Sequence, residues 1–152
     1  MTGVQTCALP IWHYQQSTGN VSLQVGVQSN NGQSTQTTQI TVSQPAGGYA
    51  GRGNGLNNPE AQGVSQKKDE ANAGPLPRGE YTIGKAEKNE HGPVSMKLTP
   101  SPENNMEGRS GFWIHADNAS KPAFNSSEGC EVLPLATRQT MSASGVTTEK
   151  VE

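Results

Sequence analysis

Glycine and proline interrupt this sequence so often that short elements joined by turns are strongly favoured. The 152 residues contain 18 glycines and 10 prolines, and hydrophobic residues make up 30%. Glycine allows the backbone dihedrals of tight turns and proline presets turn geometry, so this composition is typical of short strands with many connections. A chain of this length can bury one core without disulfides or metals, and a single domain is therefore expected.

Alternation of apolar and polar residues locates the expected strands. Val21, Leu23 and Val25 alternate with polar neighbours, the period of two that indicates a strand with one wet face. Segment 29–39 is nearly all Ser, Asn, Gln, Thr and Gly, which predicts a polar hairpin connection or a ragged edge strand. Strands are predicted at 21–28, 40–42, 80–84, 94–98 and 112–114.

One helix is predicted after Cys130. Pro134 precedes a ten-residue segment that ends at Gly145, and proline at the start with glycine past the end is the usual asymmetry of helix termini. We therefore expect a mainly β fold, a mostly antiparallel β barrel or sandwich, with one short helix that packs behind Cys130.

The first eleven residues match the translation of a common sequencing adapter. We therefore expect residues 1–11 to be an artefact, the alternative being a natural N-terminal strand, and residues 12–152 to form an N-terminally truncated domain. Under this interpretation Cys7 is not native, and Cys130 is a lone cysteine that cannot form an internal disulfide. The apolar run 8–12 is too short for a signal peptide or a membrane span, so no export signal or membrane insertion is predicted from this chain.

The charge pattern argues against two classes of partner. The formal net charge is -2, and no basic run exceeds Lys67-Lys68, so the electrostatic footprint for nucleic acid or an anionic membrane is lacking. The glycines of segment 47–55 are only a weak phosphate-loop signal, because no Lys-Ser/Thr follows them, and tight turns are the better interpretation. No cofactor is predicted.

The residues that carry chemistry are His115 and Cys130. An imidazole can take the proton of a thiol and later return it to a leaving amine, so the pair is sufficient for acyl transfer. Gly129 lets the backbone turn sharply in front of Cys130, where backbone N–H groups can point at an oxyanion. Other interpretations stay open. Cys130 can be an inert core residue, His115 a hydrogen-bonded histidine at a strand end and Asp117 a turn former, and a zinc site that includes Glu128 is weakly supported.

The block His115-x-Asp117, followed by a loop and then Ser127-x-Gly129-Cys130, resembles the signature of the L,D-transpeptidase (YkuD-like) superfamily. Two further segments, 48–59 and 74–83, resemble the branch that includes peptidoglycan-attacking type VI secretion effectors. The resemblance implies an L,D-transpeptidase-like fold, with Cys130 as nucleophile, His115 as general base, and Gly129 with Cys130 as oxyanion-hole donors.

The resemblance also extends to neighbouring positions. Asp117 is expected to orient the site and Ser127 to lie on its substrate-binding side. The chain departs from most L,D-transpeptidases at Glu128, where a second histidine is usual, and at Glu131, where an aliphatic residue is usual. Because the effector-like branch also tends to lack that histidine, we interpret the first departure as a subfamily character.

Other candidate residues have a bland and a functional interpretation. Arg109 and Arg138 flank the motif region, and each is either a solvated charge or a bidentate clamp for a carboxylate of the stem peptide. His91, in a turn, and His13, beside the adapter, are expected to be solvated surface residues rather than partners of Cys130.

The expected function is cleavage of the diaminopimelate-D-Ala bond of peptidoglycan tetrapeptide stems through a thioester on Cys130. The acyl acceptor decides between L,D-carboxypeptidase, D-amino-acid exchange and L,D-transpeptidase activity. If the effector resemblance holds, the protein is a secreted toxin that acts in the periplasm of a target cell and is blocked by an immunity protein in the producer. The alternative is a noncatalytic peptidoglycan-binding β module.

Overall fold

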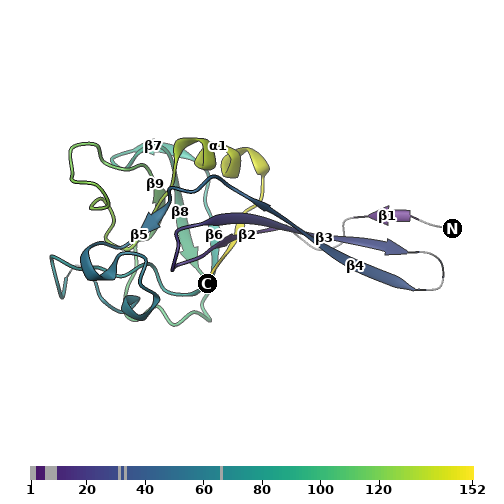
Figure 1. Cartoon of the computed structure of the whole chain (residues 1–152), viewed down its shortest axis with the longest axis horizontal. Coiled ribbons are helices and arrows are strands. Elements are labelled where there is room, and N and C mark those ends of the chain that lie inside the picture. The colour runs from purple at the N-terminus through teal and green to yellow at the C-terminus, as the bar shows by residue number, and fades with distance from the viewer. Residues whose placement is uncertain (1–2, 6–9, 31, 33, 66) are drawn as a thin grey trace.

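The computed structural model describes residues 3–5, 10–30, 32, 34–65 and 67–152 (Figure 1). Cys7 and much of the expected adapter segment 1–11 lie outside these residues. In chain order, the elements are β1 (Gly3–Gln5), β2 (Ile11–Tyr14), β3 (Val21–Asn30), β4 (Thr35–Ser43), β5 (Tyr49–Ala50), the 3-10 turns η1 (Gly53–Gly55) and η2 (Pro59–Ala61), β6 (Gly79–Ile83), β7 (Glu87–Asn89), β8 (Gly92–Pro100), β9 (Trp113–His115), β10 (Glu131–Val132), α1 (Leu135–Ser144) and β11 (Thr148–Val151).

The strands form one mixed sheet in the order β1-β3-β2-β11-β6-β8-β9-β10-β5, with β4 beside β3 and β7 beside β8. Most neighbours are antiparallel, and the pairs β2–β11 and β9–β10 are parallel. The expected mainly β fold with one short helix is confirmed, and its strands belong to one open sheet. Trp12, Leu98 and Ile114 come from different strands and share one buried cluster with Met141 of the helix. The strands therefore surround a common core.

The helix α1 lies where its end signals place it. Pro134 is its N-cap, and Gly145 ends it in the left-handed conformation with a φ of 71°. Only a residue without a Cβ adopts that conformation at little cost, so glycine stops the helix there. Met141 faces the core while Leu135 stays exposed, so the helix covers the sheet with one side.

The β3–β4 hairpin is longer than the sequence suggested. Its ladder runs from Ser22 opposite Ser43 to Asn30 opposite Thr35, so most of the described residues of segment 29–39 belong to paired strands. Of the two predictions for this segment, the edge strand is confirmed, because β4 pairs with β3 at the edge of the sheet. Backbone hydrogen bonds do not require apolar side chains, which explains why a Ser-, Gln- and Thr-rich segment can extend the sheet. In Figure 1 this hairpin reaches far from the body of the molecule. Ile40 and Val42 on β4 are about half exposed, at 48% and 50%.

Strand β11 was not predicted, and the reason is a buried acid. Glu149 points inward and is fully buried, so the segment lacks the apolar inward face by which a strand is recognised in a sequence. Its partner in the core is Glu131 of β10, which is also fully buried. The two carboxyl groups interact with each other, and neither receives a hydrogen bond from any other described group.

This carboxyl pair retains protons at neutral pH. Burial raises the pKa of Glu149 to about 7, and burial together with the charge of Glu149 raises the pKa of Glu131 well above its ordinary value. Burial is the first cause of both shifts, since a buried site offers little solvation to a carboxylate, and for Glu131 the repulsion by a charged Glu149 adds to it. The Glu131 position, which most of the resembling enzymes fill with an aliphatic residue, therefore holds an acid that packs in its neutral form.

We predict that Glu149→Gln stabilises the protein at alkaline pH. A carboxyl whose pKa is raised in the folded state stabilises the fold at acidic pH, and this contribution is lost as pH rises through the folded value of about 7. The variant should raise the Tm by roughly 5 °C or more at pH 8 and change it little at pH 5, in thermal unfolding followed by circular dichroism. Glu103→Gln, at an exposed glutamate, is the matched control. Equal effects at both pH values would contradict a raised pKa of Glu149 in the folded state.

Candidate active site

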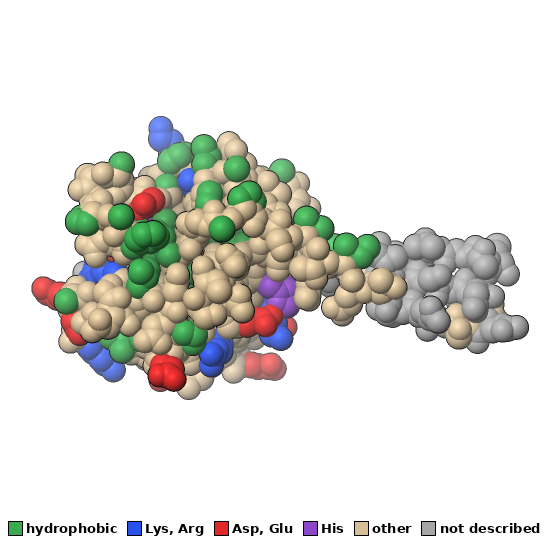
Figure 2. Space-filling view, viewed as in Figure 1, with side chains coloured by type: hydrophobic (Ala, Val, Ile, Leu, Met, Phe, Trp, Pro, Cys, Tyr) green, Lys and Arg blue, Asp and Glu red, His purple; other side chains and the backbone are tan. Residues whose placement is uncertain are grey.

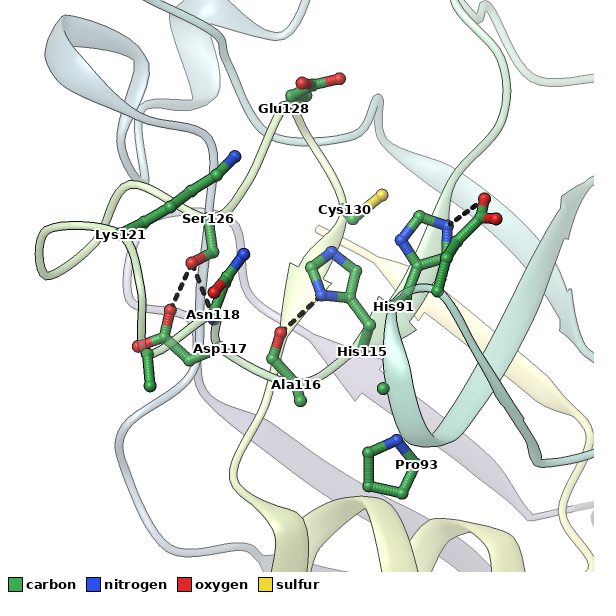
Figure 3. A pocket seen from close by; sticks show the side chains of 13 residues that line it. His91, Pro93, His115, Ala116, Asp117, Asn118, Lys121, Ser126, Glu128 and Cys130 are labelled. Atoms are coloured by element: carbon green, nitrogen blue, oxygen red, sulfur yellow. Dashed lines mark hydrogen bonds and ion pairs between the residues drawn. The ribbon is translucent and has the colours of Figure 1, made fainter.

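Cys130 and His115 meet because strands β9 and β10 run in parallel. Val132 of β10 pairs with His115 of β9, and Glu131 pairs with Ile114, so the residue before β10 lies beside the face of β9. Both side chains line an open cavity of about 520 Å³, together with His91, Asp117, Lys121 and Glu128; we call it the large cavity. Figure 3 shows the thiol and the His115 ring on the same side of this space.

The tautomer of His115 is fixed by one hydrogen bond. The Nδ1–H group donates to the carbonyl oxygen of Ala116 at 2.7 Å. Because a carbonyl only accepts, Nδ1 carries the proton and Nε2 carries the free electron pair. Nε2 is the ring nitrogen that turns toward Cys130 in Figure 3. Burial is the main cause that lowers the pKa of His115, so the ring is a neutral base at neutral pH.

The thiol of Cys130 is partly exposed and is protonated at rest. Burial raises its pKa to about 11, and the nearby Glu128 carboxylate raises it as well. The backbone N–H of Trp113 opposes this effect, since it donates to the sulfur at 3.4 Å. The thiol therefore needs a base at the moment of attack, and His115 lies in the same cavity in the state that can accept a proton.

Ser127 shapes the loop that carries the cysteine. Its side chain is fully buried. The hydroxyl oxygen accepts from the N–H of Gly51 at 2.8 Å and from that of Gly129 at 3.0 Å, and the hydroxyl donates to the carbonyl of Cys130 at 2.6 Å. Ser127 was expected on the substrate-binding side of the site, whereas its hydroxyl is used in these buried hydrogen bonds within the protein. It also occupies the Gly129 N–H, which was expected to serve an oxyanion, and leaves the N–H of Cys130 beside its own sulfur.

Position 129 requires glycine, both for its backbone conformation and for lack of space. Its φ is 131°, in the region that favours glycine, and a Cβ there would lie 2.3 Å from Nη2 of Arg109 and 2.8 Å from the ring of Phe112. A side chain at this position would displace Arg109 and the cysteine loop with it.

The buried guanidinium of Arg109 binds four backbone carbonyls and so joins three segments of the chain. Nη1 donates to the carbonyls of Gln62 at 2.6 Å and Pro75 at 2.8 Å, and Nη2 donates to those of Gly74 at 3.0 Å and Glu128 at 2.9 Å. All four terminal N–H bonds are thus used within the protein. Arg109 is neither the solvated charge nor the carboxylate clamp that the sequence suggested.

Arg138 has a similar structural position at the helix. Its side chain is buried and donates to the carbonyls of Leu133, Pro93 and Val94. These bonds join the start of α1 to the start of β8. Neither arginine lines the large cavity, where the cation is Lys121. Arg109 does line a smaller cavity together with Lys67, but its terminal N–H groups are bound to backbone carbonyls.

Asp117 organises a wall of the large cavity. Its carboxylate accepts from the hydroxyls of Ser126 at 2.6 Å and Tyr49 at 2.7 Å, and these bonds, the one from Ser126 first, lower the pKa of Asp117. In Figure 3, Asp117 and Ser126 lie across the cavity from His115. Asp117 therefore joins the loop that carries Ser126 to Tyr49 of β5, and so fixes the wall of the cavity opposite His115.

His91 is the site residue that the sequence analysis missed. Its ring stacks on that of His115, with centroids 5.3 Å apart and planes at 26°. It lines the large cavity and also a small cavity of about 220 Å³, which contains Ser65, Lys67 and Phe112 and likewise reaches Cys130. His91 is partly solvated, as expected, with 34% of its side chain exposed. Its place against the ring of His115 was not expected, and it arises because the β7–β8 turn folds back over β9. A separation of 24 positions from His115 gives no signal in the sequence.

Several further observations bear on partners. Among the described residues, no group of three or more His, Cys, Asp or Glu side chains is arranged to hold a metal ion. The same part of the chain contains no helix with the length and apolar character needed to span a membrane. On the face seen in Figure 2, acidic and basic side chains lie interspersed around the lower margin of the body.

The protein is thus a mainly β domain with one helix and a cysteine–histidine site. Its thiol and its neutral imidazole line the same open cavity. The sequence pattern of the Tlde1 domain matches residues 44–150, which include both side chains. The chain belongs to the Tlde1 domain family, a family of type VI secretion effectors. No curated protein and no solved structure matches the chain significantly.

We predict that alkylation of Cys130 is slow at neutral pH. Only the thiolate reacts, so the rate with iodoacetamide should rise about tenfold per pH unit from pH 7 toward the pKa of about 11. Peptide mass spectrometry after timed quenching separates Cys130 from Cys7. A rate that reaches its plateau near pH 7 would show that the resting thiol is already ionised.

We also predict that Arg109→Lys destabilises the fold by about 3 kcal/mol or more. A single ammonium cannot satisfy four carbonyls that a planar guanidinium satisfies together, and buried unpaired carbonyls are costly. Urea unfolding measures the change. Arg78 is an exposed arginine close in sequence to Gly74 and Pro75, whose carbonyls Arg109 binds. The free energy of unfolding of Arg78→Lys should stay within about 0.5 kcal/mol of the wild-type value. Equal stability of the two variants would refute the structural role of Arg109.

Proposed function

We propose that the protein is a peptidoglycan-modifying cysteine enzyme of the L,D-transpeptidase type, which cleaves the bond between diaminopimelate and D-alanine in tetrapeptide stems. The observation that carries this proposal is the shared cavity of Cys130 and His115, in which the unprotonated Nε2 turns toward the thiol. The membership in an effector family supports an enzymatic attack on another cell.

The reaction proceeds through a thioester. The sulfur of Cys130 attacks the carbonyl carbon of the third stem residue while the thiol proton passes to Nε2 of His115. The tetrahedral intermediate then expels D-alanine, whose amine takes the proton from His115 as the carbon–nitrogen bond breaks. Water completes an L,D-carboxypeptidase reaction, a D-amino acid completes an exchange, and the amine of a second stem completes a cross-link.

The electrostatics of the pair support a coupled proton transfer. A pKa of about 11 for the thiol and a lowered pKa for His115 mean that the neutral pair dominates at rest. The ion pair forms only during attack, when Trp113 N–H is already directed at the sulfur at 3.4 Å. A preformed donor requires no reorganisation as the charge develops, which is the usual advantage of such a site.

The charges around the thiol suit a substrate with carboxylates. Lys121 lines the large cavity and Lys67 the small one, and both cavities reach Cys130. Stem peptides carry carboxylates at their ends and on diaminopimelate, so these lysines are the proposed ligands in place of Arg109 and Arg138. As an effector, the enzyme would be secreted into the periplasm of a target cell, and an immunity protein in the producer would block the same cavity.

A noncatalytic peptidoglycan-binding module remains the second candidate, because a thiol with a raised pKa is also what an inert cysteine would have. The two candidates differ in one respect. Only the enzyme needs a neutral histidine beside the thiol, so turnover that depends on both side chains separates them.

We predict that the protein removes or exchanges the terminal D-alanine of disaccharide tetrapeptides, as measured by mass spectrometry of the muropeptides. Cys130→Ala should abolish the reaction, and His115→Gln should lower kcat by about 10²–10⁴-fold because the base is lost. Added D-methionine or a second stem in the mixture identifies the acyl acceptor.

His13→Gln is the matched control, since His13 lies in a different cavity with Glu152, and it should leave turnover unchanged. Circular dichroism checks that each variant is folded. Unchanged muropeptides with a folded wild-type protein, or full activity in Cys130→Ala, would overturn the proposed function.

A further inference from the structure

The β7–β8 turn brings a second imidazole to the site. His91 lies 5.3 Å from the ring of His115 and 5.5 Å from that of Trp113, measured between centroids. Trp113 and His115 are two positions apart on β9, so their side chains lie on the same face of the strand. One ring from the turn therefore covers both residues, including the one whose N–H binds the Cys130 sulfur.

The turn itself is held firmly. The backbone N–H of His91 donates to Oδ1 of Asn89 at 2.8 Å. Gly92 has a φ of 103°, and the side chain of Arg138 binds the carbonyl of Pro93 from below. These contacts fix the backbone on both sides of His91, so the position of its ring follows from the fold.

His115 needs such support, because within the described part of the chain its ring makes one hydrogen bond, from Nδ1 to the carbonyl of Ala116. Rotation by about 180° around the Cβ–Cγ bond would exchange the two edges of an imidazole, and such terminal torsions have broad minima. A flipped ring would turn Nε2 away from Cys130. A neighbouring ring stacked at 26° holds the His115 ring in the plane in which Nδ1 reaches the carbonyl of Ala116. It also hinders the flip, because a rotating ring must turn its edge toward His91. Without His91 the ring can leave this plane, and the hydrogen bond that selects the tautomer is lost.

We propose that His91 is a positioning residue for the reaction, which holds the His115 imidazole by stacking so that Nε2 stays turned toward Cys130. The catalytic part of this inference rests on the proposed function, whereas the orientation of the ring does not.

The charge of His91 adds a second effect on His115. A proton on His91 opposes a proton on His115 and so helps to lower the pKa of His115, after the larger effect of burial. The titratable groups around the two rings come from three elements. Glu90 lies 3.8 Å from Nε2 of His91, Arg138 acts from α1, and Asp117, Glu128, Lys121 and Cys130 line the same cavity.

The test compares His91→Phe with His91→Ala. Phenylalanine keeps an aromatic ring that can stack and removes the charge, whereas alanine removes both. Nitrogen-15 NMR of histidine-labelled protein, with His115 assigned through His115→Gln, reports its tautomer and its pKa without any need for activity. We expect one Nδ1–H tautomer in the wild type and in His91→Phe, and mixed tautomers with a raised pKa in His91→Ala. An unchanged His115 spectrum in His91→Ala would overturn the proposal.

The kinetic arm uses the same variants on muropeptides. His91→Ala should lower kcat on the order of 10²-fold with little change in KM, because a misplaced base costs rate rather than binding. His91→Phe should recover most of kcat, and the acid limb of its pH profile should move to higher pH because the opposing charge is gone. Full kcat in His91→Ala would overturn the positioning role. A wild-type protein without turnover would refute the proposed function. The NMR comparison would then still decide whether His91 orients the ring of His115.

Discussion

The site depends above all on one buried cation. Arg109 binds four backbone carbonyls, from Gln62, Gly74, Pro75 and Glu128, and so joins three chain segments at the back of the cysteine loop. In a glycine-rich chain with short strands, few packed side chains are available to fix such loops. A planar donor with five N–H bonds compensates for this, because it satisfies carbonyls that no sheet or helix can pair.

At rest, the proposed catalytic pair consists of two neutral groups, the Cys130 thiol and the His115 imidazole. Separating a proton from the Cys130 thiol is unfavourable in a poorly solvated site, and His115 is held below its ordinary pKa by the same burial. The pair therefore carries no charge at rest, and the Trp113 N–H lies where the proposed reaction would develop negative charge on the sulfur. This arrangement suits an enzyme that must stay unreactive toward other electrophiles until a substrate fills the cavity.

The sequence predicted the elements that depend on local signals. Pro134 and Gly145 located α1, and the His115 and Gly129-Cys130 motif located two side chains that share a cavity. It missed what depends on distant contacts. Strand β11 was missed because its inward residue Glu149 is an acid, which is buried beside Glu131 of a distant strand. His91 gave no signal in the sequence because only the fold of the β7–β8 turn brings it to β9. The ties made by Arg109 were missed for the same reason, since backbone carbonyls have no sequence signature.

One of the two buried acids, Glu131, is the neighbour of the proposed nucleophile and interacts with it electrostatically. Glu131 follows Cys130 directly, and the Cys130 charge is one of the causes that raise the pKa of Glu131. The effect is reciprocal, because two negative charges at a fixed distance disfavour each other equally. A protonated Glu131 is thus the state that least opposes thiolate formation. Burial of a carboxyl group usually destabilises a core. As long as Glu131 retains its proton, however, it adds no negative charge beside Cys130.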